Sequence, residues 1–177
     1  MLMRKINAGL SLLTTLLLLN HTISNAVWMV SLGNIQKSDS FILSWVLYGV
    51  MMIHAVISIG LAISAHSKAE KRKCKAYPKL NISTVDQRVS GMLLIVFTAL
   101  HVAGAAGFMH PPKLVHAIMP PCFFTIALAH VAVSTHKAFI TLGIGNARFI
   151  KTLSIATKIF CVVALIVVLI GFYLYKV

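Results

Sequence analysis

The sequence contains very few acidic residues. Its 177 residues include three carboxylates, Asp39, Glu70 and Asp86, against 16 lysines and arginines. Charged residues make up 11% of the chain, whereas a soluble domain carries roughly 25%. This deficit, together with 59% hydrophobic residues, excludes an ordinary soluble domain and predicts an integral membrane protein.

Cysteine is scarce as well. Cys74, Cys122 and Cys161 lie far apart, and they form no CxxC pair and no zinc-ligand spacing. We therefore expect them to be packing or loop residues rather than metal ligands.

The excess of positive charge, +13 at pH 7, would favour nucleic-acid binding in a soluble protein. Here the basic residues lie between long hydrophobic runs, so membrane topology explains them better. We expect a lipid bilayer as the surrounding medium and no nucleic acid as a partner.

Five apolar runs are long enough to span a membrane, which takes about 20 residues each. We predict an all-α, single-domain bundle over residues 1–177, with transmembrane helices at about 6–32, 41–66, 89–108, 115–144 and 154–175. The first run could also be a cleaved signal peptide, because Ser24-Asn25-Ala26 follows an apolar stretch. That stretch is long for a signal, however, and its removal would leave an even number of spans.

The basic residues predict the orientation of the bundle. One side receives most of them, at the N-terminus and in the second and fourth connections: Arg4, Lys5, Lys68, Lys71, Arg72, Lys73, Lys75, Lys79, Arg88, Arg148 and Lys151, with Lys158 just beyond. The other side has Lys37, Lys113 and Lys176. By the positive-inside rule the N-terminus is cytoplasmic and the C-terminus is outside, in a multi-pass protein of the cell inner membrane.

Four of the eight histidines lie deep in four different runs: His21, His54, His101 and His130. An imidazole in hydrocarbon is costly, so each needs a specific role. Helix bundles bind haem through histidines on facing helices, and bis-histidine ligation leaves no open position for oxygen or substrate. The pattern therefore predicts two bis-histidine haems that carry electrons.

Depth along the helices suggests one pair. His21 lies 13 residues after Ala8, and His101 lies 13 residues after Arg88. Both helices rise from the same side of the membrane, so at about 1.5 Å per residue both rings lie roughly 20 Å from that side. We expect these two histidines to ligate one haem in the outer half of the membrane.

The second pair is less well fixed by counting. His130 lies seven residues before Lys137 on a descending helix, in the inner half, whereas His54 lies 14 residues before Lys68, near mid-depth. Pairing His54 with His130 therefore rests partly on elimination. Hydrogen-bonded core histidines and a proton relay are the alternatives, but relays usually include carboxylates and no acidic residue lies within a span.

The residues around the deep histidines are candidates for supporting roles. Small residues, which give room for a porphyrin edge or for close helix packing, flank His54 (Gly49, Ser58, Gly60) and His101 (Ser90, Gly91, Gly104, Gly107). The candidates for contact with haem propionates are Arg4, Arg88, Ser90, His136, Lys137 and Arg148. His136 could instead extend to the membrane surface, and His66, His110 and His116 are expected at interfaces.

The chain resembles a known family along nearly its whole length. Gln87-Arg88-Val89-Ser90-Gly91 followed by His101 is similar to the third-helix signature of the cytochrome b anchor of succinate dehydrogenase and fumarate reductase, in its single-chain, five-helix, dihaem form. The other helices resemble it more loosely, through Arg4-Lys5 with His21, Ile53-His54-Ala55-Val56 with a basic tail, and His130 with Gly143-Ile144.

The resemblance implies a function and a set of partners. It implies two haem b groups, with His21 and His101 on an outer, low-potential haem and His54 and His130 on an inner one. It also implies a flavoprotein subunit and an iron–sulfur subunit on the cytoplasmic face, with dicarboxylate chemistry confined to those partners. The chain would transfer electrons between the iron–sulfur subunit and a membrane quinone, menaquinone in this form of the family.

The sequence departs from some family members in its carboxylates. The fourth run has none, so we do not expect the proton pathway that some members place there. Asp39, the outer carboxylate, is a candidate quinone-site base or an ordinary loop aspartate, and Asn20, Ser24 and Asn25 are candidates for hydrogen bonds to a quinone. The alternative functions are the cytochrome b of a hydrogenase or formate dehydrogenase, and a haem-free histidine-relay transporter.

Overall fold

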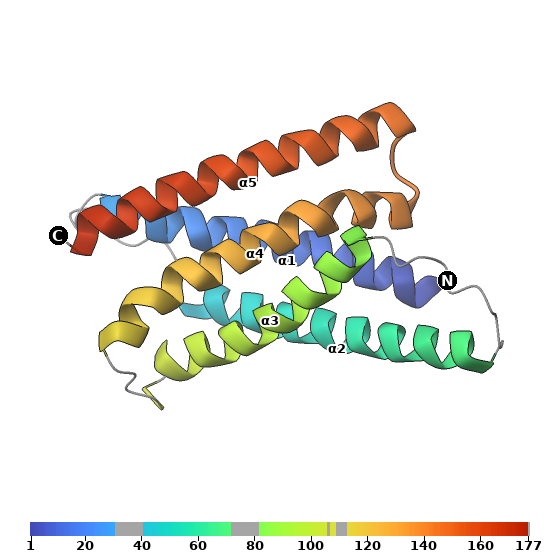
Figure 1. The fold of residues 1–177 in the computed structure, drawn as a ribbon, viewed down its shortest axis with the longest axis horizontal. Coiled ribbons are helices and arrows are strands. Elements are labelled where there is room, and N and C mark those ends of the chain that lie inside the picture. The colour runs from blue at the N-terminus through green and yellow to red at the C-terminus, as the bar shows by residue number, and fades with distance from the viewer. Residues whose placement is uncertain (31–40, 72–81, 106, 109–112, 177) are drawn as a thin grey trace.

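A computed structural model describes residues 1–30, 41–71, 82–105, 107–108 and 113–176 (Figure 1). The described residues form five helices and no strand: α1 (Leu2–Val30), α2 (Phe41–Lys71), α3 (Ile82–Ala105), α4 (Lys113–Leu142) and α5 (Ala147–Lys176). Each is long and apolar enough to cross a membrane. The prediction of an all-α, five-helix membrane bundle is confirmed.

Successive helices run in opposite directions along the bundle. Figure 1 shows α1, α3 and α5 running one way and α2 and α4 the other. The two ends of the chain therefore lie at opposite ends of the molecule, as an odd number of spans requires.

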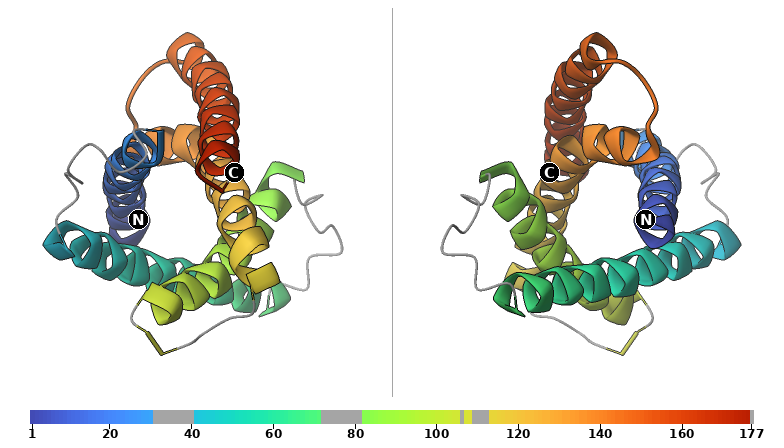
Figure 2. Two further views of the ribbon diagram at one scale, coloured as in Figure 1. Left: turned by 90° about the vertical axis from the view of Figure 1, so that its left-hand side faces the viewer. Right: turned by 90° about the vertical axis from the view of Figure 1, so that its right-hand side faces the viewer.

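Helices α1 and α4 form the centre of the packing. Helix α4 packs against α1, α3 and α5, and α1 also contacts α2 and α5. Seen along the bundle, α1 to α4 surround its centre, and α5 lies outside against α1 and α4 (Figure 2). The buried cluster of Leu128, Val131 and Cys161 joins α4 to α5.

The distribution of polar side chains is that of a protein surrounded by lipid. Large apolar residues such as Ile159, Val163 and Ile170 are exposed on α5, whereas Thr98, Ser134 and other hydroxyl residues are buried. In a bilayer an apolar outer surface is already solvated, and hydroxyl groups between helices satisfy one another or the backbone. The pattern supports contact between the bundle and lipid.

Two helices begin seven residues earlier than the apolar runs predicted. Helix α3 begins at Ile82 rather than near residue 89, and α5 at Ala147 rather than near 154. Hydropathy marks the lipid-facing part of a helix, but the backbone stays helical through the polar turn beyond it. At α5 the start is fixed by Asn146, whose Oδ1 accepts a hydrogen bond from the Phe149 N–H at 2.9 Å.

Pro120 and Pro121 lie inside α4, which begins at Lys113. Each proline removes a backbone donor, and an interior proline bends a helix. The Thr125 hydroxyl donates to the Pro121 carbonyl at 2.8 Å, which satisfies one acceptor in this segment.

Candidate functional site

The imidazole of His130 is held on both nitrogens by serine hydroxyls. Ser90 Oγ, on α3, lies 3.0 Å from its Nδ1. Ser134 Oγ, one turn further along α4, lies 3.3 Å from its Nε2. The ring therefore has a fixed orientation between α3 and α4.

The hydrogen bonds of Ser90 also indicate the tautomer of His130. Ser90 Oγ lies 2.6 Å from the backbone carbonyl of Asp86, to which it donates its one proton. The same oxygen would then accept from Nδ1–H of His130, and the Nε2 lone pair would face the Ser134 hydroxyl. A neutral imidazole whose other nitrogen is fixed by a hydrogen bond is the usual form of a histidine metal ligand.

The absence of a side chain at Gly91 leaves room for the His130 ring. A Cβ atom built on Gly91 would lie 3.1 Å from Cε1 of His130, tighter than ordinary contact. The sequence had associated Ser90 and Gly91 with His101, on the same helix. The structure places both against His130 instead, because this end of α3 packs across α4.

His54 on α2 lies within electrostatic range of His130. It also hydrogen-bonds to the backbone of Asn7 on α1. Its Nδ1 atom is buried and has no hydrogen-bond partner among the described residues. The two histidines thus lie within electrostatic range of each other, and their pairing on one haem stays a prediction.

One turn beyond His54, a pair of hydrogen bonds joins α1 to α2. The Asn7 amide donates to Ser58 Oγ at 3.0 Å, and Ser58 lies 3.2 Å from Asn7 Oδ1. Ser58 therefore has an interhelical bonding role and is not merely a small residue beside His54. Sequence reasoning missed Asn7, because a lone asparagine near a helix start gives no periodic signal.

His21 and His101 lie in the second halves of the parallel helices α1 and α3. Nδ1 of His21 is 3.4 Å from Ser44 Oγ on α2. The exposed ring of His101 stacks on Phe123 of α4, with centroids 5.3 Å apart and planes at 20°. Neither Ser44 nor Phe123 was identified from the sequence, and the pairing of these two histidines stays a prediction.

The quinone candidates lie around His21. Asn25 uses its amide to donate to the His21 backbone carbonyl at 2.6 Å, which leaves its Oδ1 as the remaining polar atom. Asn20 is exposed and Ser24 is half-buried. Asp39 lies outside the described residues, as do Lys37, Cys74, Lys79 and His110.

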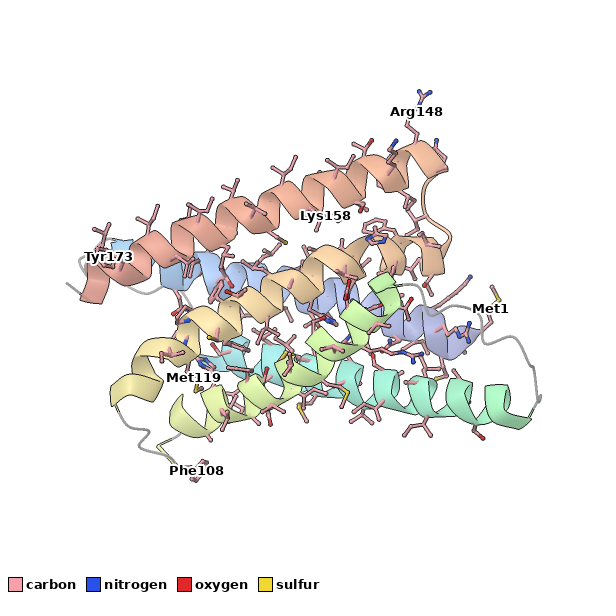
Figure 3. All side chains as sticks on the ribbon, in the orientation of Figure 1. Met1, Phe108, Met119, Arg148, Lys158 and Tyr173 are labelled. Atoms are coloured by element: carbon pink, nitrogen blue, oxygen red, sulfur yellow. The ribbon has the colours of Figure 1, made fainter. Side chains whose placement is uncertain are left out.

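Of the propionate candidates, Ser90 and Lys137 lie at the His130 site. Lys137 Nζ donates to Gln87 Oε1 at 3.1 Å and interacts electrostatically with Asp86. Arg4, Arg88 and Arg148 are exposed, and Figure 3 shows Arg148 pointing away from the bundle.

His136, the sixth propionate candidate, instead lines a separate cavity between α4 and α5. It lies six positions after His130 along α4, so the two rings lie on different faces of the helix.

No protein-family model, curated protein or solved structure matches the chain. Among the described residues, no group of three or more histidine, cysteine or acidic side chains is arranged to hold a metal ion. A haem with bis-histidine ligation needs two protein ligands, which His54 and His130 would supply.

Proposed function

We propose that this chain is the dihaem cytochrome b membrane anchor of a succinate:quinone oxidoreductase. In this proposal it carries electrons between an iron–sulfur subunit and membrane quinone, and a partner flavoprotein performs the dicarboxylate chemistry. The observation that carries the proposal is that His54 lies within electrostatic range of His130, whose Nδ1 is hydrogen-bonded by Ser90.

The residues around this pair fit a haem. His54 has a buried nitrogen without a partner in the described part of the chain, and such a group is costly unless something binds it. Gly91 places no side chain against the His130 ring. Lys137 supplies a nearby cation for a propionate. A haem held by two histidines supplies one-electron transfer without an open coordination site.

The outer haem would be held by His21 and His101, an assignment that rests on the resemblance and on the equal depth of the two residues. Phe123 stacks on His101 and Ser44 contacts His21, so each ring already has a neighbour that restricts its orientation. Asn20, Ser24, Asn25 and Asp39 remain the candidates for contact with menaquinone.

The partner subunits would dock where exposed basic residues gather. Arg4, Lys5, Arg88 and Arg148 are exposed near the starts of α1, α3 and α5, all at one end of the bundle (Figure 1). In our proposal this end is the cytoplasmic face of the cell inner membrane, with the flavoprotein and the iron–sulfur subunit bound to it.

The test is a haem count on the purified chain or complex, by reduced-minus-oxidised spectra and a pyridine haemochrome assay. We expect two b-type haems per chain, one in His54→Ala and one in His101→Ala. In the complex, His101→Ala should abolish quinone reduction while succinate oxidation with an artificial acceptor continues.

Other outcomes would point to the alternatives. Co-purification with hydrogenase or formate dehydrogenase subunits would keep the cytochrome and reject the succinate assignment. A well-folded preparation without a Soret band would reject the cytochrome and leave the histidine-relay transporter.

A further inference from the structure

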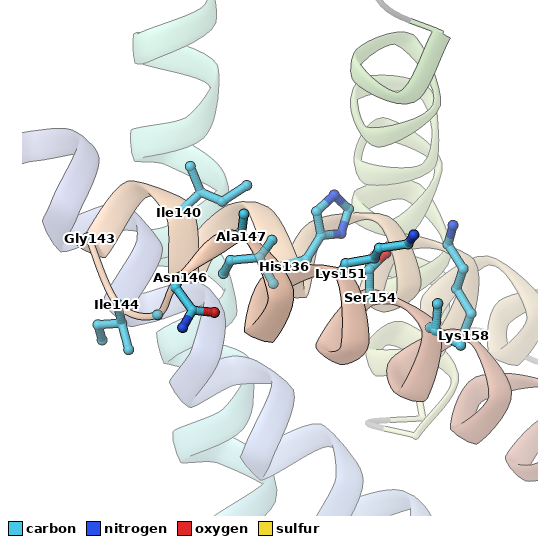
Figure 4. A pocket seen from close by; sticks show the side chains of 12 residues that line it. His136, Ile140, Gly143, Ile144, Asn146, Ala147, Lys151, Ser154 and Lys158 are labelled. Carbon is cyan, nitrogen blue, oxygen red and sulfur yellow. The ribbon is translucent and has the colours of Figure 1, made fainter.

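A second polar feature lies away from the four deep histidines, where α4 ends and α5 begins. It is a cavity of about 710 Å³, lined by the last two turns of α4, the connecting turn and the first three turns of α5 (Figure 4). Gly143 and Gly145, with φ of 76° and 90°, let the chain reverse tightly enough to close one side of it.

Three cationic or potentially cationic side chains face this cavity: His136, Lys151 and Lys158. Lys151 and Lys158 are two helical turns apart on α5, so they share one face. His136 lies within electrostatic range of Lys158, and its Nδ1 is buried without a hydrogen-bond partner among the described residues. No carboxylate is among the described residues that line the cavity.

This grouping is costly without an anion. Lys151 and Lys158 lie in the first three turns of the apolar span Ala147–Gly171, where an ammonium group without a counter-charge is unfavourable. Both lysines line the same space as His136, and no described residue of the wall supplies a negative group to offset their charge. The Ser154 hydroxyl adds a neutral donor on the same wall.

Apart from Asn146, which caps α5, the rest of the wall is made of apolar residues and glycines. Ile140, Ile144 and Ile155 line the cavity beside the lysines. The spans Ile118–Leu142 and Ala147–Gly171 end and begin here, which places the cavity at the level where headgroups meet hydrocarbon. A ligand that fits is therefore anionic at one end and apolar at the other.

We propose that this cavity binds the headgroup phosphate of an anionic phospholipid. The ammonium groups of Lys151 and Lys158 bind the phosphate oxygens, Ser154 donates to them, and the acyl chains lie along the isoleucines. Basic pockets between transmembrane helices select anionic headgroups in this way. A choline headgroup would add a positive charge beside the two lysines, so phosphatidylglycerol is favoured over phosphatidylcholine. The site is independent of the haem proposal.

The test is native mass spectrometry of the detergent-purified full chain, titrated with phosphatidylglycerol, phosphatidylcholine or inorganic phosphate. We expect phosphatidylglycerol to bind more tightly than phosphatidylcholine. The double variant Lys151→Gln/Lys158→Gln should weaken phosphatidylglycerol binding by about 25-fold, at about fivefold per lysine. The double variant Lys151→Arg/Lys158→Arg, which keeps both charges, should bind like the wild type.

The matched control is Lys5→Gln/Arg148→Gln, which removes two exposed charges at the same end of the bundle but outside the cavity. We expect it to retain phosphatidylglycerol binding. Equal losses in the two double Gln variants, or equal binding of both lipids, would overturn the proposal. Tighter binding of inorganic phosphate than of lipid would show that the site takes a free anion. If Lys151→Gln/Lys158→Gln does not fold, the proposal is tested by comparing phosphatidylglycerol with phosphatidylcholine binding to the wild-type chain.

Discussion

At the scale of single residues, the hydrogen bonds of His130 distinguish its two nitrogens. Ser90 orients the ring through Nδ1, whereas Ser134 contacts Nε2, the atom assigned to iron. We expect Ser90→Ala to weaken haem retention at this site by about 10- to 100-fold, the usual effect of losing a hydrogen bond to a metal-ligating histidine. Ser134→Ala should retain both haems.

The measurement is the haem-to-protein ratio during dialysis against apomyoglobin, with the midpoint potential of each haem recorded alongside. Ser90→Thr keeps a hydroxyl and serves as the conservative control. If Ser134→Ala loses haem and Ser90→Ala does not, the ligating nitrogen has been assigned the wrong way round.

Gly91 gives a second residue-scale prediction. A Cβ atom added to Gly91 would lie 3.1 Å from the His130 ring. We therefore expect Gly91→Val to push that ring aside and to remove one haem from the chain, as measured in the reduced spectrum. Gly9 has no heavy atom within 4 Å of its Cβ position, so Gly9→Val is the matched control and should retain two. Equal haem content in both variants would mean that the contact with Gly91 is unimportant.

At the scale of elements, the Asn7–Ser58 pair links α1 to α2 between otherwise apolar surfaces. Interhelical hydrogen bonds in membranes average about 0.6 kcal/mol. We therefore expect Asn7→Leu and Ser58→Ala each to destabilise the bundle by about 1 kcal/mol. In a double-mutant cycle the combined variant should cost little more than either single one.

Unfolding by SDS in mixed micelles, followed by circular dichroism, measures this effect. Thr125→Ala is a suitable control, because that hydroxyl is exposed and bonds within its own helix. Strict additivity of Asn7→Leu and Ser58→Ala would show that the two side chains do not interact.

At the scale of the whole molecule, five antiparallel helices place the chain ends on opposite sides of a membrane (Figure 1). The excess of basic residues in the N-terminal turn and the second and fourth connections predicts which end is cytoplasmic. An N-terminal epitope should resist protease in spheroplasts, and a C-terminal epitope should be cleaved. Inside-out vesicles should give the reverse pattern. Cleavage of both epitopes from the same side would reject the five-span topology.

The sequence alone predicted the number and order of the helices, because a membrane span needs a long apolar run and the basic residues between runs mark the connections. It predicted the helix ends less well. Hydropathy reports contact with lipid, whereas backbone hydrogen bonding continues into polar turns such as the starts of α3 and α5, where a cap like Asn146 decides the first residue.

Tertiary structure alone decided which side chains meet. The sequence placed Ser90 and Gly91 with His101 because they share a helix, but the crossing of α3 and α4 puts them against His130. It also gave no indication of Asn7, Ser44 or Phe123. It listed His136 among the propionate candidates, whereas the ring lines the cavity between α4 and α5. The reason is physical. A sequence pattern indicates how deep a residue lies in the membrane and, loosely, on which face of its helix. Contacts between helices depend on crossing angles, and the packing of all five helices determines those angles.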